Sequence, residues 1–154
     1  MKQLVDKLIE YKKTIATMES CTGGGVANAI TNIEGASEIL KFSAVTYSNE
    51  YKIKMGVSKK IIDKYSVYSI ETAREMAYNI AHFANSNYGV GITGKLNRVD
   101  INNPFGEDNV TFVSIYDKDN NIYDDMKIEA TKETRAQNKE VIIDKIKQKI
   151  LTKF

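Results

Sequence analysis

Small hydroxyl and thiol side chains stand next to a run of glycines near the N-terminus, where residues 19–25 read Glu-Ser-Cys-Thr-Gly-Gly-Gly. An apolar run at 14–18 precedes them and a helical pattern follows. Glycine lets the backbone bend tightly and approach a ligand, and the first amides of a helix lack intrahelical partners, so that they can hold an anion. We therefore expect the amides of residues 21–24 to bind an oxyanion beside Ser20, the alternative being that the glycines only permit a tight turn.

A serine nucleophile needs a group that accepts its proton, and histidine is the usual one. The chain contains one histidine, His82, which falls in the middle of a predicted helix at 70–86, where a packed or half-exposed side chain is expected. A Ser-His-Asp triad is therefore disfavoured, and a zinc site built from several histidines is excluded. Lysine remains as the base, provided that burial or a nearby positive charge lowers its pKa towards neutrality.

The sequence offers such a lysine in the run Tyr-Ser-Asn-Glu-Tyr-Lys at 47–52. This run begins at the end of a predicted strand and continues into a helix, which places Tyr47 and Lys52 about one and a half turns apart. In a parallel α/β sheet, this strand end and the Ser20 turn open at the same carboxyl edge, where such folds bind ligands. The alternative is that Tyr47 packs in the core and Lys52 lies on the surface.

Cys21 is a competing nucleophile. A thiol at the N-terminus of a helix has its pKa lowered by the helix dipole, and the thiolate is the reactive form. An isolated cysteine is more often a small buried side chain. From the residues alone both interpretations stay open.

Three motifs, taken in order, resemble the C-terminal domain family of CinA, the competence and damage-inducible protein. They are Glu-Ser-Cys-Thr-Gly-Gly at 19–24, Tyr-Ser-Asn-Glu-Tyr-Lys at 47–52 and Thr-Gly at 93–94. The resemblance runs from about the first predicted helix to the last and covers nearly the whole chain. Active members of that family are nicotinamide mononucleotide deamidases, in which the serine of the first motif is the nucleophile and the lysine of the second is its base.

Carried over, the resemblance implies that Ser20 is the nucleophile, Lys52 its base and Tyr47 a proton relay or an orienting hydroxyl. The implied activity is that of an amidohydrolase acting on a linear amide: it converts nicotinamide mononucleotide to nicotinic acid mononucleotide and ammonia, with no metal and no organic cofactor. An alternative is a catalytically inactive member that only binds the nucleotide. A further alternative is a competence-related partner protein of the same fold.

The resemblance also implies substrate contacts along the chain, at Cys21, Thr22, Gly23, Gly24, Asn49, Thr93, Gly94, Arg98 and Arg135. After Thr-Gly the family continues with Ile-Ala-Gly-Pro and a glycine-rich stretch, whereas this chain has Lys-Leu-Asn-Arg-Val-Asp at 95–100. Either the substrate preference has changed, or Arg98 replaces contacts that backbone amides make in the family. Arg98 and Arg135 both suit a phosphate, because a guanidinium offers paired donors. The acidic residues Asp100, Glu107 and Asp108 are expected to lie in a solvated loop and not to hold a metal.

Hydrophobic periodicity predicts the elements that must position these residues. Helices are expected at 2–13, 23–33, 49–55, 58–65, 70–86 and 133–151, and strands at 14–18, 42–47, 88–92, 110–116 and 122–128. The last two strands flank Asp-Lys-Asp-Asn-Asn at 117–121, which indicates a hairpin because Asn and Asp tolerate left-handed conformations. The pattern predicts a single-domain α/β fold over residues 1–154: an α/β/α sandwich with a mixed, mainly parallel sheet and a C-terminal β-hairpin followed by a long helix.

Composition narrows the class of protein. The net charge of +2 comes from 22 basic and 20 acidic residues spread along the chain, which is not the basic stripe of a nucleic-acid groove. One cysteine allows no internal disulfide, and no run approaches the ~18 apolar residues of a membrane span. We therefore expect a cytoplasmic protein that binds no nucleic acid and no membrane; the resemblance implies that its partner is a small-molecule nucleotide substrate. Apolar faces left over on the helices at 70–86 and 133–151 predict a homo-oligomer, a dimer or larger.

Overall fold

The computed structural model describes residues 1–97 and 100–154, and its five strands form one sheet in the order β2-β1-β3-β4-β5. The strands are β1 (Ile15–Glu19), β2 (Leu40–Val45), β3 (Tyr88–Gly94), β4 (Val110–Asp117) and β5 (Ile122–Glu129). Both neighbours of β1 pair with it in parallel, whereas β4 pairs antiparallel with β3 and with β5. Four of the five strands therefore point the same way, and the predicted mixed sheet and C-terminal hairpin are confirmed.

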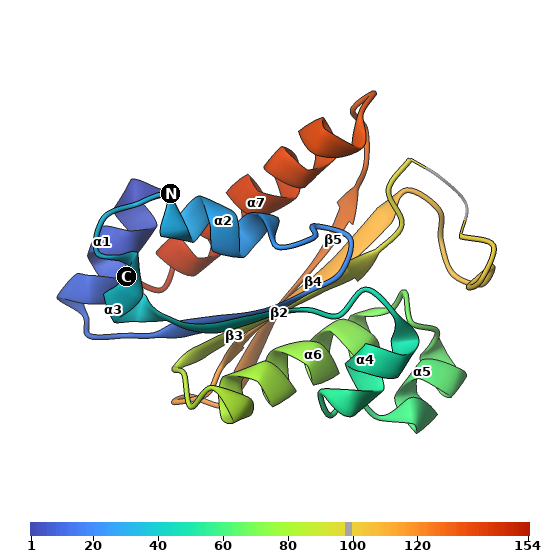
Figure 1. Cartoon of the computed structure of the whole chain (residues 1–154), viewed down its shortest axis with the longest axis horizontal. Helices are drawn as coiled ribbons and strands as arrows, with labels where there is room; N and C mark the ends of the chain where they lie inside the picture. The colour runs from blue at the N-terminus through green and yellow to red at the C-terminus, as the bar shows by residue number, and fades with distance from the viewer. Residues whose placement is uncertain (98–99) are drawn as a thin grey trace.

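Helices cover both faces of the sheet (Figure 1). On one face lie α1 (Lys2–Glu10), α2 (Gly25–Thr31), α3 (Ala36–Ile39) and α7 (Arg135–Leu151). On the other lie α4 (Asn49–Lys54), α5 (Lys59–Tyr65) and α6 (Ile70–Phe83). The predicted α/β/α sandwich is confirmed, and α3 is the one helix of the described residues that periodicity did not predict, because four residues are too short to show a period.

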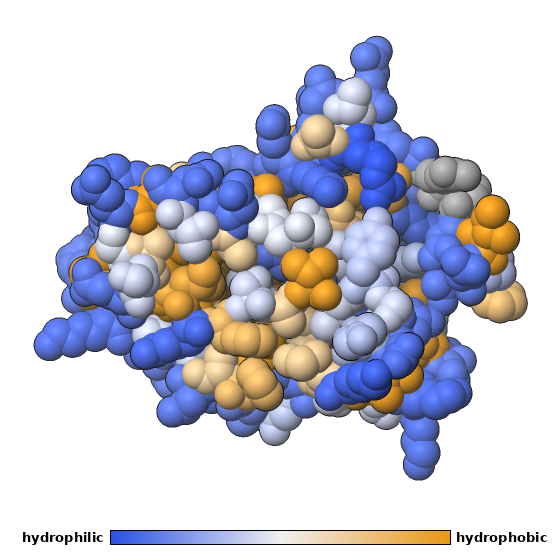
Figure 2. Space-filling model, in the orientation of Figure 1, coloured by the Kyte–Doolittle hydropathy of each residue, from blue (hydrophilic) through white to orange (hydrophobic). Residues whose placement is uncertain are grey.

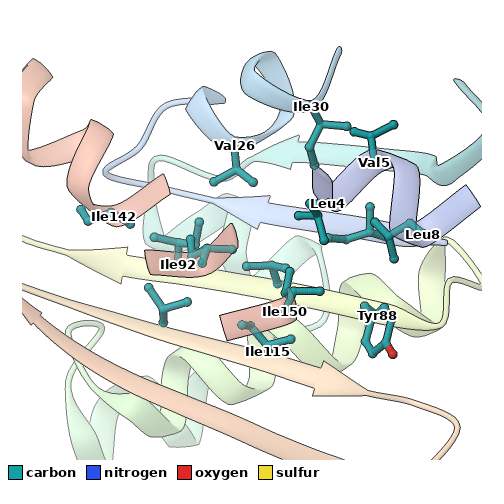
Figure 3. Close-up of a cluster of buried hydrophobic side chains, with 14 of the residues drawn as sticks. Leu4, Val5, Leu8, Val26, Ile30, Tyr88, Ile92, Ile115, Ile142 and Ile150 are labelled. Carbon is teal, nitrogen blue, oxygen red and sulfur yellow. The ribbon is translucent and has the colours of Figure 1, made fainter. Parts of the chain in front are cut away.

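The larger core cluster lies between the sheet and the face formed by α1, α2 and α7 (Figure 3). Its side chains come from both layers; those labelled in the figure are Leu4, Val5, Leu8, Val26, Ile30, Tyr88, Ile92, Ile115, Ile142 and Ile150. All of them are buried. Burial of this kind is the main force that holds a helix on a sheet, so this cluster anchors α2 and with it the turn that precedes it.

Some boundaries differ from the predicted ones for local reasons. The helix expected at 23–33 begins only at Gly25, because Gly23 and Gly24 have φ of +64° and +89°, values outside the right-handed helical region. The first helix ends at Glu10, two residues before Lys12 with φ of 53°. The helix expected at 70–86 ends at Phe83, before Asn85 with φ of 48°.

The alanine face of α6 is not free for self-association, contrary to our expectation. It packs against β3, where Gly89 and Gly91 bring the strand so close that an added Cβ would lie 2.1 Å from the carbonyl oxygens of Ala77 and Ala73 respectively. On α7 the apolar side chains at 142, 146 and 150 are likewise buried. Formation of a homo-oligomer remains a prediction, but these two helix faces are buried within the chain and do not provide its interface.

Exposed apolar side chains gather instead along the free edge of the sheet. Figure 2 shows apolar residues in the middle of a largely polar face, where β2 runs in Figure 1. Phe42 and Val45 on β2 and Phe83 at the end of α6 are exposed, and the rings of Phe42 and Phe83 lie 5.1 Å apart. Within the described residues, no helix has the length and apolar character needed to cross a membrane.

The close packing of α6 on β3 predicts that Gly91→Ala destabilises the fold. The new methyl group would collide with the backbone of α6, which cannot move aside as a flexible side chain would, so we expect a loss of about 1–3 kcal/mol or more in the free energy of unfolding. Urea denaturation measures it. Gly25→Ala is the matched control, because its methyl group meets only the end of the Ile143 side chain, at 3.0 Å. Equal stability of the two variants would contradict the prediction.

Candidate active site

A cavity of about 750 Å³ opens at the carboxyl ends of β1 and β2, next to the loop at 95–109 and the start of α7. Figure 1 shows these segments meeting at one end of the sheet. The cavity is lined by residues from five parts of the chain: Ser20, Cys21, Val45, Tyr47, Ser48, Asn49, Tyr51, Tyr68, Gly94, Lys95, Leu96, Asp100, Asn102, Asn103 and Arg135. The sheet topology thus brings six of the twelve residues that the sequence pointed to into one cavity wall.

The turn that carries Ser20 is fixed by the buried carboxylate of Glu19, the last residue of β1. This carboxylate accepts hydrogen bonds from the Thr22 hydroxyl at 2.6 Å and from the amides of Val26 and Ala27 at 3.2 and 2.9 Å. The expectation that the first amides of the helix stay unpaired is therefore wrong, because the side chain preceding Ser20 takes two of them. The helix N-terminus holds its own strand end and not a ligand.

The other residues of the turn face different ways. The Gly23 amide donates to the Ser20 carbonyl at 2.9 Å, which closes the turn, and the Thr22 side chain is buried against Glu19. In the described part of the chain, Thr22, Gly23 and Gly24 do not line the cavity. Ser20 and Cys21 are the residues of the turn that reach it.

Ser20 and Lys52 lie side by side. The Lys52 Nζ is 3.0 Å from the Ser20 Oγ and donates to the Thr46 carbonyl at 2.7 Å. Only 2% of Lys52 is exposed, so the interpretation of Lys52 as a surface residue is wrong. Burial disfavours the charged ammonium and lowers the pKa of Lys52 from 10.5 to about 8. An amine with this pKa is partly uncharged near neutral pH and can accept a proton from a hydroxyl in contact with it.

The two alternative reactive groups are placed differently. Cys21 is buried with its Sγ 3.7 Å from the Thr111 Oγ1, and burial raises the pKa of its thiol instead of lowering it as a helix N-terminus would. His82 lies on α6 with its Nδ1 2.9 Å from the Tyr78 carbonyl, and it does not line the cavity. Neither arrangement provides a reactive thiolate or a histidine base.

Tyr47 and Arg135 meet at the mouth of the cavity. Tyr47 is 65% exposed, and its hydroxyl accepts a hydrogen bond of 3.4 Å from the Arg135 Nη2. The Arg135 Nη1 donates to the Leu96 carbonyl, which ties the start of α7 to the loop after β3. The interpretation of Tyr47 as a core residue is wrong, and among the described residues its hydroxyl bonds to Arg135 and not to Ser20 or Lys52.

The other residues predicted to contact the substrate lie either in the wall of the cavity or directly behind it. Asn49 lines the cavity, and its Nδ2 donates to the Asn103 Oδ1 at 2.9 Å. Gly94 also lines it, at a position where a Cβ would lie 2.5 Å from the Val110 carbonyl oxygen. Thr93 is buried behind the wall, and its hydroxyl donates to the Val67 carbonyl at 2.8 Å.

The loop at 95–109 holds site residues that sequence reasoning missed. Lys95 is buried, with its Nζ 3.0 Å from the Asp108 Oδ1 and 5.2 Å from the centre of the Tyr68 ring. The Tyr68 hydroxyl donates to the carboxylate of Asp100, which also lines the cavity. The sequence did contain one signal for a role of Lys95 in the site, because this residue stands directly after a buried strand. The predicted contact Arg98 lies outside the described residues.

The acidic residues of this loop have separate partners. Asp108 pairs with Lys95, Glu107 pairs with Lys127 at 2.7 Å, and Asp100 accepts from Tyr68. Within residues 1–97 and 100–154, no group of three or more histidine, cysteine, aspartate or glutamate side chains is arranged to hold a metal ion.

Known proteins of similar sequence belong to one family. The family model of the CinA C-terminal domain matches residues 1–144. A putative competence-damage inducible protein of Alkaliphilus metalliredigens is 48% identical over 89 residues, which are 57% of this chain and 22% of that protein. One of Clostridium acetobutylicum is 51% identical over 88 residues, 56% of this chain and 21% of that protein. The match thus spans about a fifth of the length of these curated relatives.

Solved structures share the fold. A competence/damage inducible protein of Agrobacterium tumefaciens superposes with a TM-score of 0.85 at 22% identity, covering 98% of this chain and 93% of its own. A competence-damaged protein (CinA) superfamily protein of Escherichia coli superposes with a TM-score of 0.89 at 21% identity, covering 99% of this chain and 87% of its own. Identity this low shows a common fold and leaves the chemistry to be argued from the site.

The role of Glu19 predicts that Glu19→Gln loosens the turn. A glutamine side chain has the shape of glutamate, but its NH2 group is a donor and would face the Thr22 hydroxyl or the amides of Val26 and Ala27, which are donors too. At least one of these buried groups would lose its acceptor, so we expect a loss of about 1–3 kcal/mol in the free energy of unfolding. Urea denaturation tests it. Glu34→Gln, at an exposed site, is the control. A Glu19→Gln protein as stable as that control would show that the carboxylate does not hold the turn.

Proposed function

This chain belongs to the CinA C-terminal domain family, and from that premise we propose that it is an amidohydrolase that converts nicotinamide mononucleotide to nicotinic acid mononucleotide and ammonia. The observation that carries the proposal is the contact of 3.0 Å between the Ser20 Oγ and the Nζ of a buried lysine whose pKa is lowered to about 8. A surface lysine would stay protonated at neutral pH and could not activate a hydroxyl.

In the proposed first step, uncharged Lys52 accepts the proton of the Ser20 hydroxyl while the Ser20 Oγ attacks the carboxamide carbon. The Thr46 carbonyl orients the amine, because it accepts one of the Nζ hydrogens at 2.7 Å. The Nζ lone pair is then directed to the other neighbour within hydrogen-bond distance, which is Ser20. This arrangement supports a Ser-Lys pair that needs neither a histidine nor an organic cofactor.

The oxyanion that forms on the carboxamide needs donors in the turn. The amides of Gly23, Val26 and Ala27 are engaged with the Ser20 carbonyl and with Glu19. We assign the oxyanion to the amides of Cys21 and Thr22, the first two after the nucleophile, which donate to no backbone carbonyl among the described residues. Backbone donors fixed in this way contribute several kcal/mol to the transition state.

Collapse of the tetrahedral intermediate releases ammonia, which takes the proton held by Lys52, and water then hydrolyses the acyl-enzyme. Tyr47 stands at the cavity mouth and is proposed to orient the nucleotide together with Arg135, whose guanidinium suits a phosphate. Asn49, Gly94 and, beyond the described residues, Arg98 complete the proposed contacts. The cytoplasm, where such nucleotides occur, is the proposed location.

Substitution of the two central residues predicts loss of ammonia release. Ser20→Ala removes the nucleophile, and Lys52→Met removes the base, which alone should lower kcat/KM by about 10²- to 10⁴-fold. Cys21→Ala keeps turnover, because the thiol is buried beside Thr111. The measurement is ammonia release from nicotinamide mononucleotide. Turnover that survives in Ser20→Ala and is lost in Cys21→Ala would show that the Cys21 thiol is the nucleophile. Thermal stabilisation of the wild type by the nucleotide, without release of ammonia, would show that the protein binds the nucleotide but does not hydrolyse it.

The lowered pKa of Lys52 predicts the pH dependence. The active form is the free amine, so kcat/KM should rise about tenfold per pH unit below pH 8 and level off above it. An unperturbed lysine, with its pKa of 10.5, would give a rate still rising at pH 9 to 10. Initial rates between pH 6 and 10 check this, with Cys21→Ala measured in parallel to exclude titration of the thiol. A rate that falls on raising the pH from 6 to 8 contradicts the role of Lys52 as base.

A further inference from the structure

The cavity presents one carboxylate whose hydrogen bonds all come from neutral groups. Asp100 accepts from the Tyr68 hydroxyl, from the Asn103 Nδ2 at 2.9 Å and from the Asn102 amide at 2.9 Å. The bonds from Tyr68 and Asn103 are the main reason why the pKa of Asp100 is lowered, and they keep the group ionised. Within residues 1–97 and 100–154, Asp100 makes no salt bridge, and it is the one carboxylate among them that lines the cavity.

Aromatic rings line the same cavity and also favour a positive charge. Tyr47, Tyr51 and Tyr68 contribute them. The electron-rich face of a tyrosine ring attracts cations, and two of these rings already have one nearby: the Lys54 Nζ lies 4.7 Å from the centre of the Tyr51 ring, and the Lys95 Nζ lies 5.2 Å from that of Tyr68.

Among the described residues, the other charged groups of the cavity do not cancel this preference. Lys95 is paired with Asp108, and Lys52 is mainly uncharged above its pKa of about 8, which is the form that acts as a base. Arg135 lies at the mouth beside Tyr47, where it suits the anionic end of a ligand. Asp100 is linked through the side chain of Asn103 to Asn49, so the carboxylate lies on the same wall of the cavity as the start of the helix that carries Lys52.

We propose that Asp100 is the counter-charge for the ring of the substrate, so that the cavity selects a cationic pyridinium carboxamide over a neutral one. This inference rests on the proposed function and makes it more specific. The ring nitrogen of a nicotinamide nucleotide bears a positive charge because it is bonded to the ribose, whereas free nicotinamide and the dihydropyridine form are neutral. A carboxylate and three tyrosine rings complement such a ring, and the arginine complements the phosphate at the other end.

The test separates ring charge from the rest of the ligand. Ser20→Ala protein, which cannot turn the ligand over, is titrated calorimetrically with nicotinamide mononucleotide and with its reduced, neutral dihydropyridine form. Both ligands keep the carboxamide, ribose and phosphate. We expect the cationic ligand to bind roughly tenfold more tightly, which corresponds to about 1.4 kcal/mol. Absence of this preference overturns the proposal without any change at Asp100.

Three variants in the same background then assign the preference. Asp100→Asn removes the negative charge and keeps the size of the side chain. It should weaken binding of the cationic ligand roughly tenfold, which corresponds to about 1.4 kcal/mol, and leave binding of the neutral ligand unchanged. Tyr68→Phe keeps the carboxylate and should keep the preference. Glu107→Gln is the matched control, because it removes one negative charge from the same loop but outside the cavity wall.

Two further outcomes count against the proposal. Equal weakening of both ligands in Asp100→Asn would mean that the carboxylate accepts hydrogen bonds from ribose hydroxyls, and unchanged binding of both would mean that it does not face the ligand. The proposed function is judged separately, by ammonia release from the wild type. Ammonia release without charge preference removes only the role of Asp100, and charge preference without ammonia release removes only the hydrolysis.

Discussion

The position of Ser20 depends on one carboxylate that has no cationic partner among the described residues. Glu19 ends β1 fully buried, and its charge is compensated by the Thr22 hydroxyl and by two amides at the start of α2. A buried charge with fewer donors would be costly, so the turn has little freedom to open. Ser20 is the next residue, so its position is fixed together with the turn. The strand, the turn and the helix are joined through a single side chain.

The position of Lys52 follows from the parallel pairing of β1 and β2. The Thr46 amide continues this ladder past the end of the strand by donating to the Glu19 carbonyl at 2.8 Å. Ser20 and Thr46 therefore leave the sheet side by side, and the Nζ of Lys52 fits between the hydroxyl of one and the carbonyl of the other. The N-cap of α4, in which the Ser48 side chain accepts from the Tyr51 amide, starts the helix that returns Lys52 to this point.

Local sequence signals were enough for every element except α3: Leu4, Val5 and Leu8 predicted α1, for example, and the Asn-rich turn predicted the β4–β5 hairpin. The pairing of Ser20 with Lys52 was implied by the resemblance of the runs at 19–24 and 47–52 to the CinA family, because the residues alone left open a surface position for Lys52. Boundaries shifted where residues such as Lys12 and Asn85 adopt positive φ, which periodicity does not register. The bond between Asp100 and Tyr68 was not predictable, because the two residues lie 32 positions apart in the chain. The contacts of Glu19 are local, with Thr22, Val26 and Ala27, but a charged residue has the same sequence pattern whether it is buried or solvated.

The buried amine also links folding to proton exchange. In the unfolded chain Lys52 would titrate at its ordinary pKa of 10.5, whereas in the folded protein it titrates at about 8. Below pH 8 the folded state therefore bears the full penalty of a confined ammonium, and this penalty is relieved as the pH rises from 8 towards 10.5. Between these values the molecule sheds a proton when it folds. The same confinement that readies the lysine for chemistry thus weakens the fold at neutral pH, and the interior around it must supply the compensating stability.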